Sequence, residues 1–573
     1  MAVVTLHAMR VGIVRRTPGS SPRSRALVIA GFLINWLAVP AGAQVQFRDL
    51  DLLRPVPVED AWPVARHAFE FQAPWDYVQP AGGAAQNQLD LDLAYGAAMN
   101  GHLGLRLPVA FGPGGDTGLA GAGLFALYNP VREGPGVPAL ALRGDFFAPT
   151  GGPARAGLTA IATRSFGAAR LHANAGAAAG AGASEEVPRW QGGVALDYTF
   201  FRTSLLVVGA LTASAPGDGE PTAAVVSAGV RWQWTPTMVL EAGAGRRLSA
   251  SGPDLRLTLG LSTTFGLRAL VPIRPPSGPA VVHGRSEQFY YPGSFNWRFL
   301  DTDPEAARLF HAFDYGHAIL YQRLTTAPHG DPDWLEREQF EFLTQDLLVR
   351  PPRLPIAEEA LYPAYAERYW PAALAFDWAH MLHRQIYDVL SNTRLTPDAR
   401  DSLVERLTDY YLSRRDLAFA PVPKSMALMM DQPYSGAFLR AYPRFNGLIW
   451  AYHWLQVGLY EPLMVEQEAG PRQAGVDAAL ARFRAMIPDS FPTSMPMTPM
   501  VAPEFAARHP RAAAIFDNLH SLHDIISDIL LSDVVAPDSK RAAILAALEE
   551  FRDGKRNVMP DEEWRGTAAT HHH

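Results

Sequence analysis

Between residues 66 and 270, apolar side chains alternate with polar or very small ones, and this period of two restricts the fold more than any other feature. Residues 89–99 place Leu, Leu, Leu, Tyr, Ala and Met at every second position, with Asp90 and Asp92 between them. The pair Asn100-Gly101 predicts a hairpin turn into a second run over residues 102–111. Similar runs occupy residues 193–200, 226–234 and 255–262. The pattern predicts antiparallel strands.

The length and number of these runs favour a membrane barrel. There are about eleven or twelve runs of roughly ten to thirteen residues, which suits strands tilted across an outer membrane and is long for a soluble sheet. No second segment approaches the ~20 apolar residues of a spanning helix. The predicted fold of residues 66–270 is an antiparallel transmembrane β-barrel of about 12 strands. A secreted β-sandwich with one solvated face remains the alternative.

The charged face of the runs is predicted to line the lumen, because hydrocarbon excludes charge and an aqueous lumen tolerates it. Aromatic residues near the run ends suit the two membrane interfaces: Tyr198, Phe200, Phe201, Trp232 and Trp234. The predicted lumen-lining residues are Asp90, Asp92, Arg106, Arg143, Asp145, Asp197, Arg231, Glu241 and Arg256.

Residues 1–43 have the order of a secretory signal peptide. Five arginines and no acid precede a short apolar stretch over residues 26–38, and Ala41-Gly42-Ala43 follows as an A-x-A cleavage site. The mature chain is expected to begin at Gln44, with residues 44–65 as an N-terminal segment. An uncleaved membrane anchor is the alternative.

Composition excludes several kinds of function. The chain has no Cys, which excludes disulfides, thiolate metal sites, a Cys nucleophile and covalent haem, so any metal must use His, carboxylate or Met ligands. The net charge of −7 and the lack of a long basic run give no support for nucleic-acid binding.

Within residues 66–270, five segments carry a more specific pattern: Gly118–Tyr128, Pro138–Arg143, Ala148–Gly151, Phe166–Gly176 and the closing strand Pro253–Phe265. These segments resemble the outer-membrane barrels of the phenol-degradation meta-pathway transporter-like family. The resemblance implies a barrel that passes hydrophobic or aromatic compounds, and it carries over no site residues. The family normally ends at its last strand, whereas about 300 residues follow here.

The second half of the chain changes to a helical period. A Pro-rich linker over residues 271–283 separates the barrel from an all-α domain predicted over residues 284–566. Because an even strand number places both barrel ends in the periplasm, this domain is expected to be periplasmic. The predicted helices are 305–324, 334–349, 364–390, 399–411, 445–463, 474–486, 511–531 and 539–551.

The helical half contains an internal repeat at an offset of 140 residues. Two hairpins, over residues 364–413 and 504–553, share the pattern Asp-x-x-His-x-x-His-x4-Asp on one helical face. A helix with one His in an aromatic setting precedes each copy. Facing helices that carry His and carboxylates can build a di-metal site. The candidate ligands are His317, Asp377, His380, His383, Asp388, His453, Asp517, His520, His523 and Asp528.

The repeated residues leave several interpretations open. They can bind iron, copper or another transition metal, hold a non-covalent haem between His317 and His453, or form structural His–Asp pairs. A phosphohydrolase of the His-Asp type lacks its further partners. Two methionine groups, around residues 426–430 and 495–500, offer thioethers for Cu(I) or serve as apolar filler.

Two functions are predicted. The first is an outer-membrane channel or uptake protein of a Gram-negative-type bacterium for small, hydrophobic or aromatic solutes, with the helical domain as plug, docking or binding module. The alternative is a barrel-anchored His/Asp metalloprotein, either di-metal or b-type haem, acting as an oxidoreductase. The expected partners are outer-membrane lipid, the barrel-assembly machinery and the solute.

Overall fold

The computed structural model describes residues 47–51, 54–98, 100–111, 117–131, 133, 137–180, 189–215, 221–266, 290–291, 293–356, 358, 361–465, 468–488 and 490–570. The predicted signal peptide and the Pro-rich linker lie outside these residues. In the part of the chain that is described, no helix has the length and apolar character needed to cross a bilayer.

The first half forms a closed antiparallel barrel whose wall has twelve strands among the described residues. The short strands β1 (Ala68–Gln72) and β2 (Trp75–Pro80) follow one another along a single wall position between β3 and β14 and close the barrel. In the same way β5 (Gly118–Leu119) and β6 (Gly121–Val131) share one position beside β4. The other strands are β3 (Gln86–Ala98), β4 (Gly101–Phe111), β7 (Ala139–Pro149), β8 (Arg155–Phe166), β9 (Ala169–Gly180), β10 (Arg189–Phe200), β11 (Leu205–Ala215), β12 (Ala223–Thr235), β13 (Met238–Arg247) and β14 (Pro253–Gly266).

Exposure alternates along each wall strand as the sequence pattern requires. On β6, Leu124 is 59% exposed, whereas the neighbouring Phe125 and Leu127 are buried. The outward face is a band of Leu, Val and aromatic side chains. Four of the five predicted interface aromatics are exposed, but Phe201 is buried, because it belongs to a turn that packs on the helical domain. Its assignment to an interface girdle is therefore wrong.

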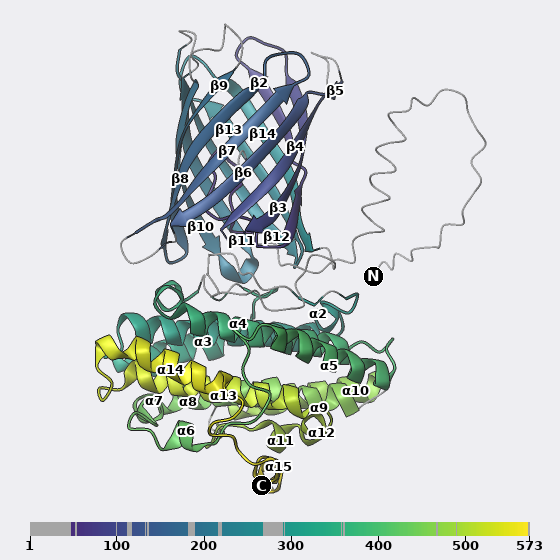
Figure 1. Ribbon diagram of the computed structural model, residues 1–573, viewed down its shortest axis with the longest axis vertical. Coiled ribbons are helices and arrows are strands. Elements are labelled where there is room, and N and C mark those ends of the chain that lie inside the picture. Colours follow the sequence, from purple (N-terminus) through teal and green to yellow (C-terminus); the bar gives the residue numbers. More distant parts are fainter. Residues whose placement is uncertain are drawn as a thin grey trace, which may run out of the picture.

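The second half is a helical domain below one end of the barrel (Figure 1). The predicted helix over residues 334–349 is instead two wider turns, η3 (Trp334–Gln339) and η4 (Phe342–Leu347), in which Leu348 donates to the carbonyl of Leu343 five residues earlier. The α-helices are α2 (Arg298–Thr302), α3 (Pro304–Thr326), α4 (Pro363–Leu390), α5 (Pro397–Ser413), α6 (Ala427–Met430), α7 (Ala437–Ala441), α8 (Pro443–Gly458), α9 (Tyr460–Val465), α10 (Ala469–Met486), α11 (Thr498–Val501), α12 (Pro503–Arg508), α13 (Pro510–Leu531), α14 (Lys540–Arg552) and α15 (Asp561–Gly566).

Four helices, α3, α4, α8 and α13, surround the centre of this domain. α3 packs against the other three, and α4 packs against α13. Their facing surfaces are almost wholly buried; along α13, every residue from Ala512 to Leu531 is buried except Asp524. This arrangement brings the histidines of both hairpins into one core.

The same hydrogen-bonding pattern occurs twice in this domain. The carboxyl group of Asp388 accepts from the backbone N–H groups of Trp297 and Phe299, at the start of α2. Asp528 accepts in the same way from Gly436 and Phe438, at the start of α7. Each start needs a left-handed residue, Trp297 at φ +70° and Gly436 at φ +71°. The α2–α3 and α7–α8 segments therefore correspond at an offset of 139 residues.

The barrel and the helical domain meet at the β10–β11 and β12–β13 turns. Phe201 packs on Ile356. Arg202 forms a half-exposed ion pair of 2.9 Å with Asp346. Arg353 donates to the backbone carbonyls of Gln233 and Trp234 and stands over the Trp232 ring. The helical domain thus covers this end of the barrel (Figure 1).

Candidate functional site

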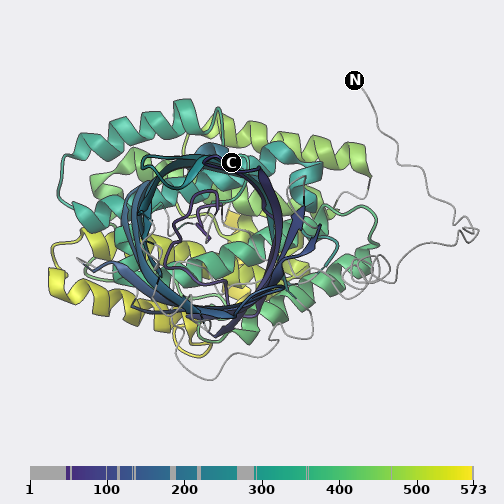
Figure 2. The same ribbon diagram turned by 90° about the horizontal axis from the view of Figure 1, so that it is seen from above.

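Residues 47–51 and 54–66, which we call the lumen segment, lie inside the barrel (Figure 2). The segment begins at the helical-domain end, where Arg48 donates to Thr199. It rises to the middle of the wall at residues 54–59 and returns to the same end, where Arg66 forms a bridge with Gly96. Leu50, Val56, Val58, Ala61 and Val64 are buried. The segment therefore fills the half of the lumen nearest the helical domain.

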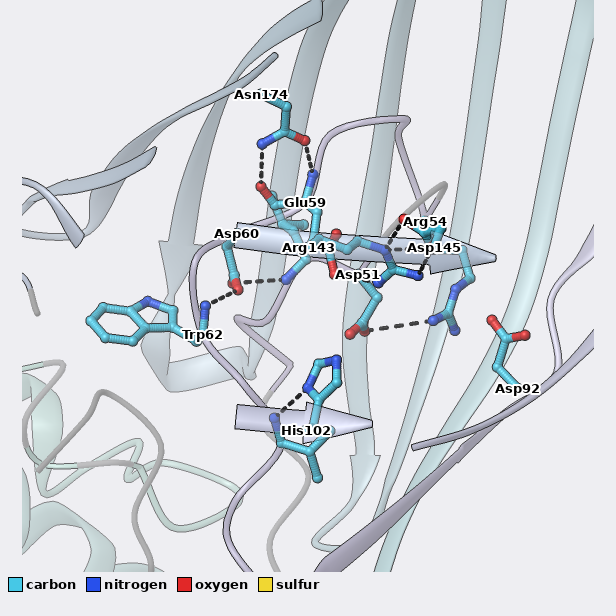
Figure 3. A network of polar contacts seen from close by, with 12 residues as sticks. Asp51, Arg54, Glu59, Asp60, Trp62, Asp92, His102, Arg143, Asp145 and Asn174 are labelled. Atoms are coloured by element: carbon cyan, nitrogen blue, oxygen red, sulfur yellow. Dashed lines mark hydrogen bonds and ion pairs between the residues drawn. The ribbon is translucent and has the colours of Figure 1, made fainter. Parts of the chain in front are cut away.

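Ion pairs tie the lumen segment to three sides of the wall. Glu59 accepts from Arg143 of β7 at 2.9 Å (Figure 3). Asp60 lies 3.5 Å from Arg170 of β9, and Asp51 lies 3.0 Å from Arg231 of β12. All six side chains are at most 13% exposed, so these pairs are shielded from solvent.

Backbone contacts and close packing fix the segment further. Both polar atoms of the Asn174 amide bond to the backbone of Glu59, at 2.8 Å each (Figure 3). Pro55 lies so close to the wall that a Cβ added at Gly243 would come within 2.1 Å of its carbonyl oxygen. Glycine at position 243 is therefore required by the close approach of the segment.

The predicted lumen-lining residues are buried or half-buried in the wall, and many of them pair with other wall residues. Asp92 binds Arg106, Asp145 binds Arg143, and Glu241 lies near Arg231. Asp197 pairs with Arg170 and His172, Arg256 pairs with Asp76, and Asp90 accepts from Gln88.

The half of the lumen away from the helical domain retains a cavity of about 220 Å³. The inward side chains Arg106, Phe125, Asp145 and Phe147 line it, together with Arg155, Thr159 and Gln191. The guanidinium groups of Arg106 and Arg143 both stand over the Phe125 ring, 5.7 and 4.5 Å from its centroid. The cavity thus offers aromatic faces beside guanidinium groups.

In the helical domain, His317 of α3, His453 of α8 and His523 of α13 form one cluster, which we call the histidine triad. One ring nitrogen from each lies within 4.8 Å of the others, and all three residues are buried. Among the described residues, both ring nitrogens of His317 and His453 and Nδ1 of His523 have no hydrogen-bond partner. Each buried, unpaired polar group costs about 1–3 kcal/mol.

The imidazoles of the triad are neutral. Burial lowers the pKa of His317, His453 and His523 well below the usual value, and the neighbouring imidazoles lower it further. Each ring therefore carries one nitrogen lone pair at pH 7, which is the form that binds a metal ion.

A second buried group lies nearby, made of Asp314, Glu358 and His380. Each member has a protein partner, and two buried atoms of the group, Oδ1 of Asp314 and Nε2 of His380, have no hydrogen bond within the described part of the chain. Nδ1 of His380 lies 2.6 Å from Glu358, which also accepts from Tyr362. Asp314 is paired with Arg384. Burial raises the pKa of Asp314 to about 6, against the opposing effect of Arg384.

The other predicted ligands lie in other polar contacts. His383 bonds to Tyr460, and Nε2 of His520 lies 2.8 Å from the Gln456 amide oxygen. The repeated aspartates are not brought to the triad. Asp388 and Asp528 bind helix starts, Asp517 accepts from Thr498 and Trp564, and Asp377 is half-buried outside both groups. The fold therefore does not bring the repeated His and Asp side chains together as one set of metal ligands.

Sequence reasoning missed Asp314 and Glu358. At the structural offset of 139, Asp314 of α3 corresponds to His453 of α8, and His317 corresponds to Gln456. His317 and His453 therefore do not occupy equivalent positions of the repeat but lie one helical turn apart. The similar aromatic residues around them suggested in the sequence that they were equivalent. Glu358 lies between helices, where no periodic pattern marks it. The methionine groups do not enter the triad; Met495 is buried and accepts from Ser521.

The triad does not fit a haem. The ring centroids of His317 and His453 are 5.5 Å apart, and the rings of Phe313 and His523 lie 4.1 and 4.2 Å from His317. A porphyrin between two axial imidazoles needs a broad flat slot, which these packed rings occupy. The donor set suits a single metal ion.

Comparisons with known proteins extend only to the barrel. No protein-family model matches the chain, and no curated protein matches it. Among solved structures, an outer membrane channel from Pseudomonas putida F1 is 18% identical, covering 38% of this chain and 100% of that one, with a TM-score of 0.29. The KdgM porin (12% identity, 34% and 99% coverage, TM-score 0.25) and the NanC porin (7%, 34% and 98%, TM-score 0.27) are further examples. At these values the likeness carries no functional argument.

Proposed function

We propose that this chain is an outer-membrane uptake channel for small solutes, closed by its own lumen segment and carrying a periplasmic helical domain. The outward band of Leu, Val and aromatic side chains supports membrane insertion, since such a face is costly to expose to water. The charged lumen supports passage of a solute through water rather than through lipid.

One observation carries the proposal: the half of the lumen nearest the helical domain is filled by a segment that is no part of the barrel wall. Apart from the Arg66–Gly96 bridge, the described residues of the lumen segment form no ladder with the wall strands. Side-chain ion pairs and local packing hold it instead. It can therefore leave the lumen while the wall stays intact, as a gate must.

The turn lengths support a periplasmic position for the helical domain. At the helical-domain end, two residues separate the strands of the β3–β4, β8–β9 and β12–β13 pairs, four separate β10 from β11 and seven separate β6 from β7. At the other end, eight residues separate β9 from β10 and seven separate β11 from β12. Membrane barrels typically have short periplasmic turns and longer extracellular loops.

The cavity indicates the class of solute. The cavity lies beyond the Glu59–Arg143 pair, toward the barrel end with the longer loops, which is opposite the helical domain. A solute entering from that end reaches the cavity before it meets the lumen segment. Phe125 and Phe147 provide ring faces, and Arg106 and Arg155 provide positive charge. A small aromatic molecule with a hydroxyl or carboxylate group matches both. The family resemblance of residues 66–270 supports the same choice.

Uptake by proteoliposomes tests the proposal. The full chain is reconstituted, and entry of benzoate, phenol and glucose is compared with empty vesicles. We expect benzoate and phenol to enter faster than glucose, and Phe147→Ala to reduce their entry severalfold. Leu142→Ala is the matched control, because Leu142 lies on the same strand but faces outward, 48% exposed. Rates equal to those of empty vesicles for every solute would overturn the channel; glucose entering as fast as benzoate would overturn the solute class.

A further inference from the structure

We propose that the core of the helical domain binds one divalent transition-metal ion, with the imidazoles of His317, His453 and His523 as its ligands. This site is separate from the lumen and does not depend on the channel proposal. It lies among α3, α8 and α13, and each of these helices contributes one ligand.

The geometry of the triad fits one ion. Ligand nitrogens about 2.0–2.1 Å from a zinc-sized ion lie some 3–4 Å from one another. The three candidate nitrogens are already within 4.8 Å of one another. Small side-chain rotations would therefore complete the site without any change in the helices.

The pattern of hydrogen bonds assigns the ion to the triad and not to the neighbouring carboxylate group. Asp314, Glu358 and His380 each have a charged or hydroxyl partner among Arg384, Tyr362 and one another, and two of their buried atoms, Oδ1 of Asp314 and Nε2 of His380, have no hydrogen bond to a described residue. The triad has five ring nitrogens without partners among the described residues. Buried polar groups are rarely left in this state, and a metal ion would bind one lone pair from each ring.

The surrounding residues hold the rings in position. The backbone carbonyl of His523 accepts from Tyr321 at 3.1 Å and from Ser527 at 3.0 Å. Phe376 packs on the His523 ring and Phe313 on the His317 ring, each at 4.1 Å between centroids. Such support is typical of sites whose ligands must keep one geometry.

The chemistry of the donors sets the class of metal. Three neutral imidazoles suit Zn²⁺, Co²⁺, Ni²⁺, Cu²⁺ or Fe²⁺ and disfavour Mg²⁺ and Ca²⁺, which prefer oxygen. Three protein ligands leave a fourth position of a tetrahedron unfilled. The repeat places Gln456 at the position equivalent to His317, and Asp314 at the position equivalent to His453. The repeat therefore does not generate a second histidine triad.

Metal analysis of the full chain tests the proposal. A variant lacking the terminal His571–His573 is purified without a polyhistidine tag, stripped with chelator and loaded with Zn²⁺ or Co²⁺. We expect one ion per chain, visible absorption from tetrahedral Co²⁺, and X-ray absorption showing three imidazole ligands. Less than a tenth of an ion per chain after loading, or an oxygen-only shell, would overturn the site.

Matched variants locate the ion. His453→Gln and His523→Gln should reduce bound metal at least tenfold. His311→Gln should keep it, because His311 is equally buried on α3 but lies outside the triad and bonds to the Pro352 carbonyl. Circular dichroism establishes that each variant is folded; if a triad variant does not fold, the ligand count from X-ray absorption of the wild type decides. Metal retained by both folded triad variants would contradict the proposal.

Discussion

The guanidinium of Arg143 binds two carboxylates at once, Asp145 on its own strand and Glu59 on the lumen segment, at 2.8 and 2.9 Å. The ion pair between Arg143 and Glu59 joins the barrel wall to the lumen segment. Because Arg143 and Glu59 are both nearly inaccessible to solvent, their attraction is weakly screened. The contact therefore holds the lumen segment in place.

Removing the acidic side chains of the lumen segment should open the channel. Breaking a buried ion pair by removing one partner costs about 3–5 kcal/mol. We expect Glu59→Gln combined with Asp60→Asn to raise single-channel conductance severalfold in planar bilayers. Arg247→Gln is the control, because Arg247 pairs with Asp254 at the loop end and both are well exposed, so its loss costs about 0–1 kcal/mol. Equal conductance in the two variants would count against the gate.

A side chain at position 243 should displace the segment without removing any charge. Its Cβ would meet the Pro55 carbonyl at 2.1 Å, so Gly243→Val requires Pro55 to move. At Gly209 on β11 a Cβ meets nothing within 4 Å, which makes Gly209→Val the matched control. Heat-modifiable gel mobility should show both barrels folded, with faster benzoate entry in Gly243→Val alone. A Gly243→Val barrel that is folded and as closed as the control would be inconsistent with close packing of the segment.

Two buried aspartates of the helical domain should each contribute a loss of stability as pH rises from about 4 to about 8, while the buried histidines, whose pKa is lowered, contribute in the opposite direction. Burial raises the pKa of Asp388 to about 8 and that of Asp517 to about 7, although hydrogen bonds to their carboxyl groups oppose this. The folded protein therefore binds these protons more tightly than the unfolded chain does, and the free energy of unfolding falls as they are lost. Thermal melts at pH 5 and pH 8 measure the slope, which Asp388→Asn should reduce. A pH dependence of the melting temperature in Asp388→Asn identical to that of the wild type would contradict this assignment.

Metal should stabilise the helical domain through the triad. A ligand that binds only the folded state contributes about 2.7 kcal/mol at a hundredfold excess over its Kd. We expect Zn²⁺ to raise the melting temperature by several degrees and chelator to reverse the rise. His311→Gln should behave like the wild type and His453→Gln should not respond. An identical response from His453→Gln would place the stabilising ion elsewhere.

The architecture of the wall could be predicted from the sequence because its two faces meet different surroundings. Hydrocarbon outside and water inside force the period of two, so Leu124 and Leu142 face outward and Asp92 and Arg143 face inward. Helix positions also follow from apolar periodicity, as in the predicted 364–390 against the observed Pro363–Leu390.

The candidate sites were harder to predict because they depend on tertiary contacts. The position of the lumen segment has one signal in the sequence: its acidic residues match the inward-facing arginines of the wall in charge. The alternation of apolar and polar residues does not show this match. The repeat drew attention to Asp388 and Asp528, but their carboxyl groups hold helix starts. The triad takes one ligand from a repeated position, His523, and two from helices whose register only the fold defines.

Locking the lumen segment to the wall tests the central claim most directly, and the absence of native Cys makes the experiment clean. The backbone N–H of Ala61 donates to the Thr163 hydroxyl at 3.0 Å, so these two positions are close neighbours and are chosen for the pair Ala61→Cys with Thr163→Cys. Benzoate entry into proteoliposomes is measured after oxidation and after reduction, with each single variant as control. The gate predicts that oxidation abolishes entry and reduction restores it in the double variant alone. Equal entry in the oxidised and reduced states of a fully cross-linked protein would contradict it.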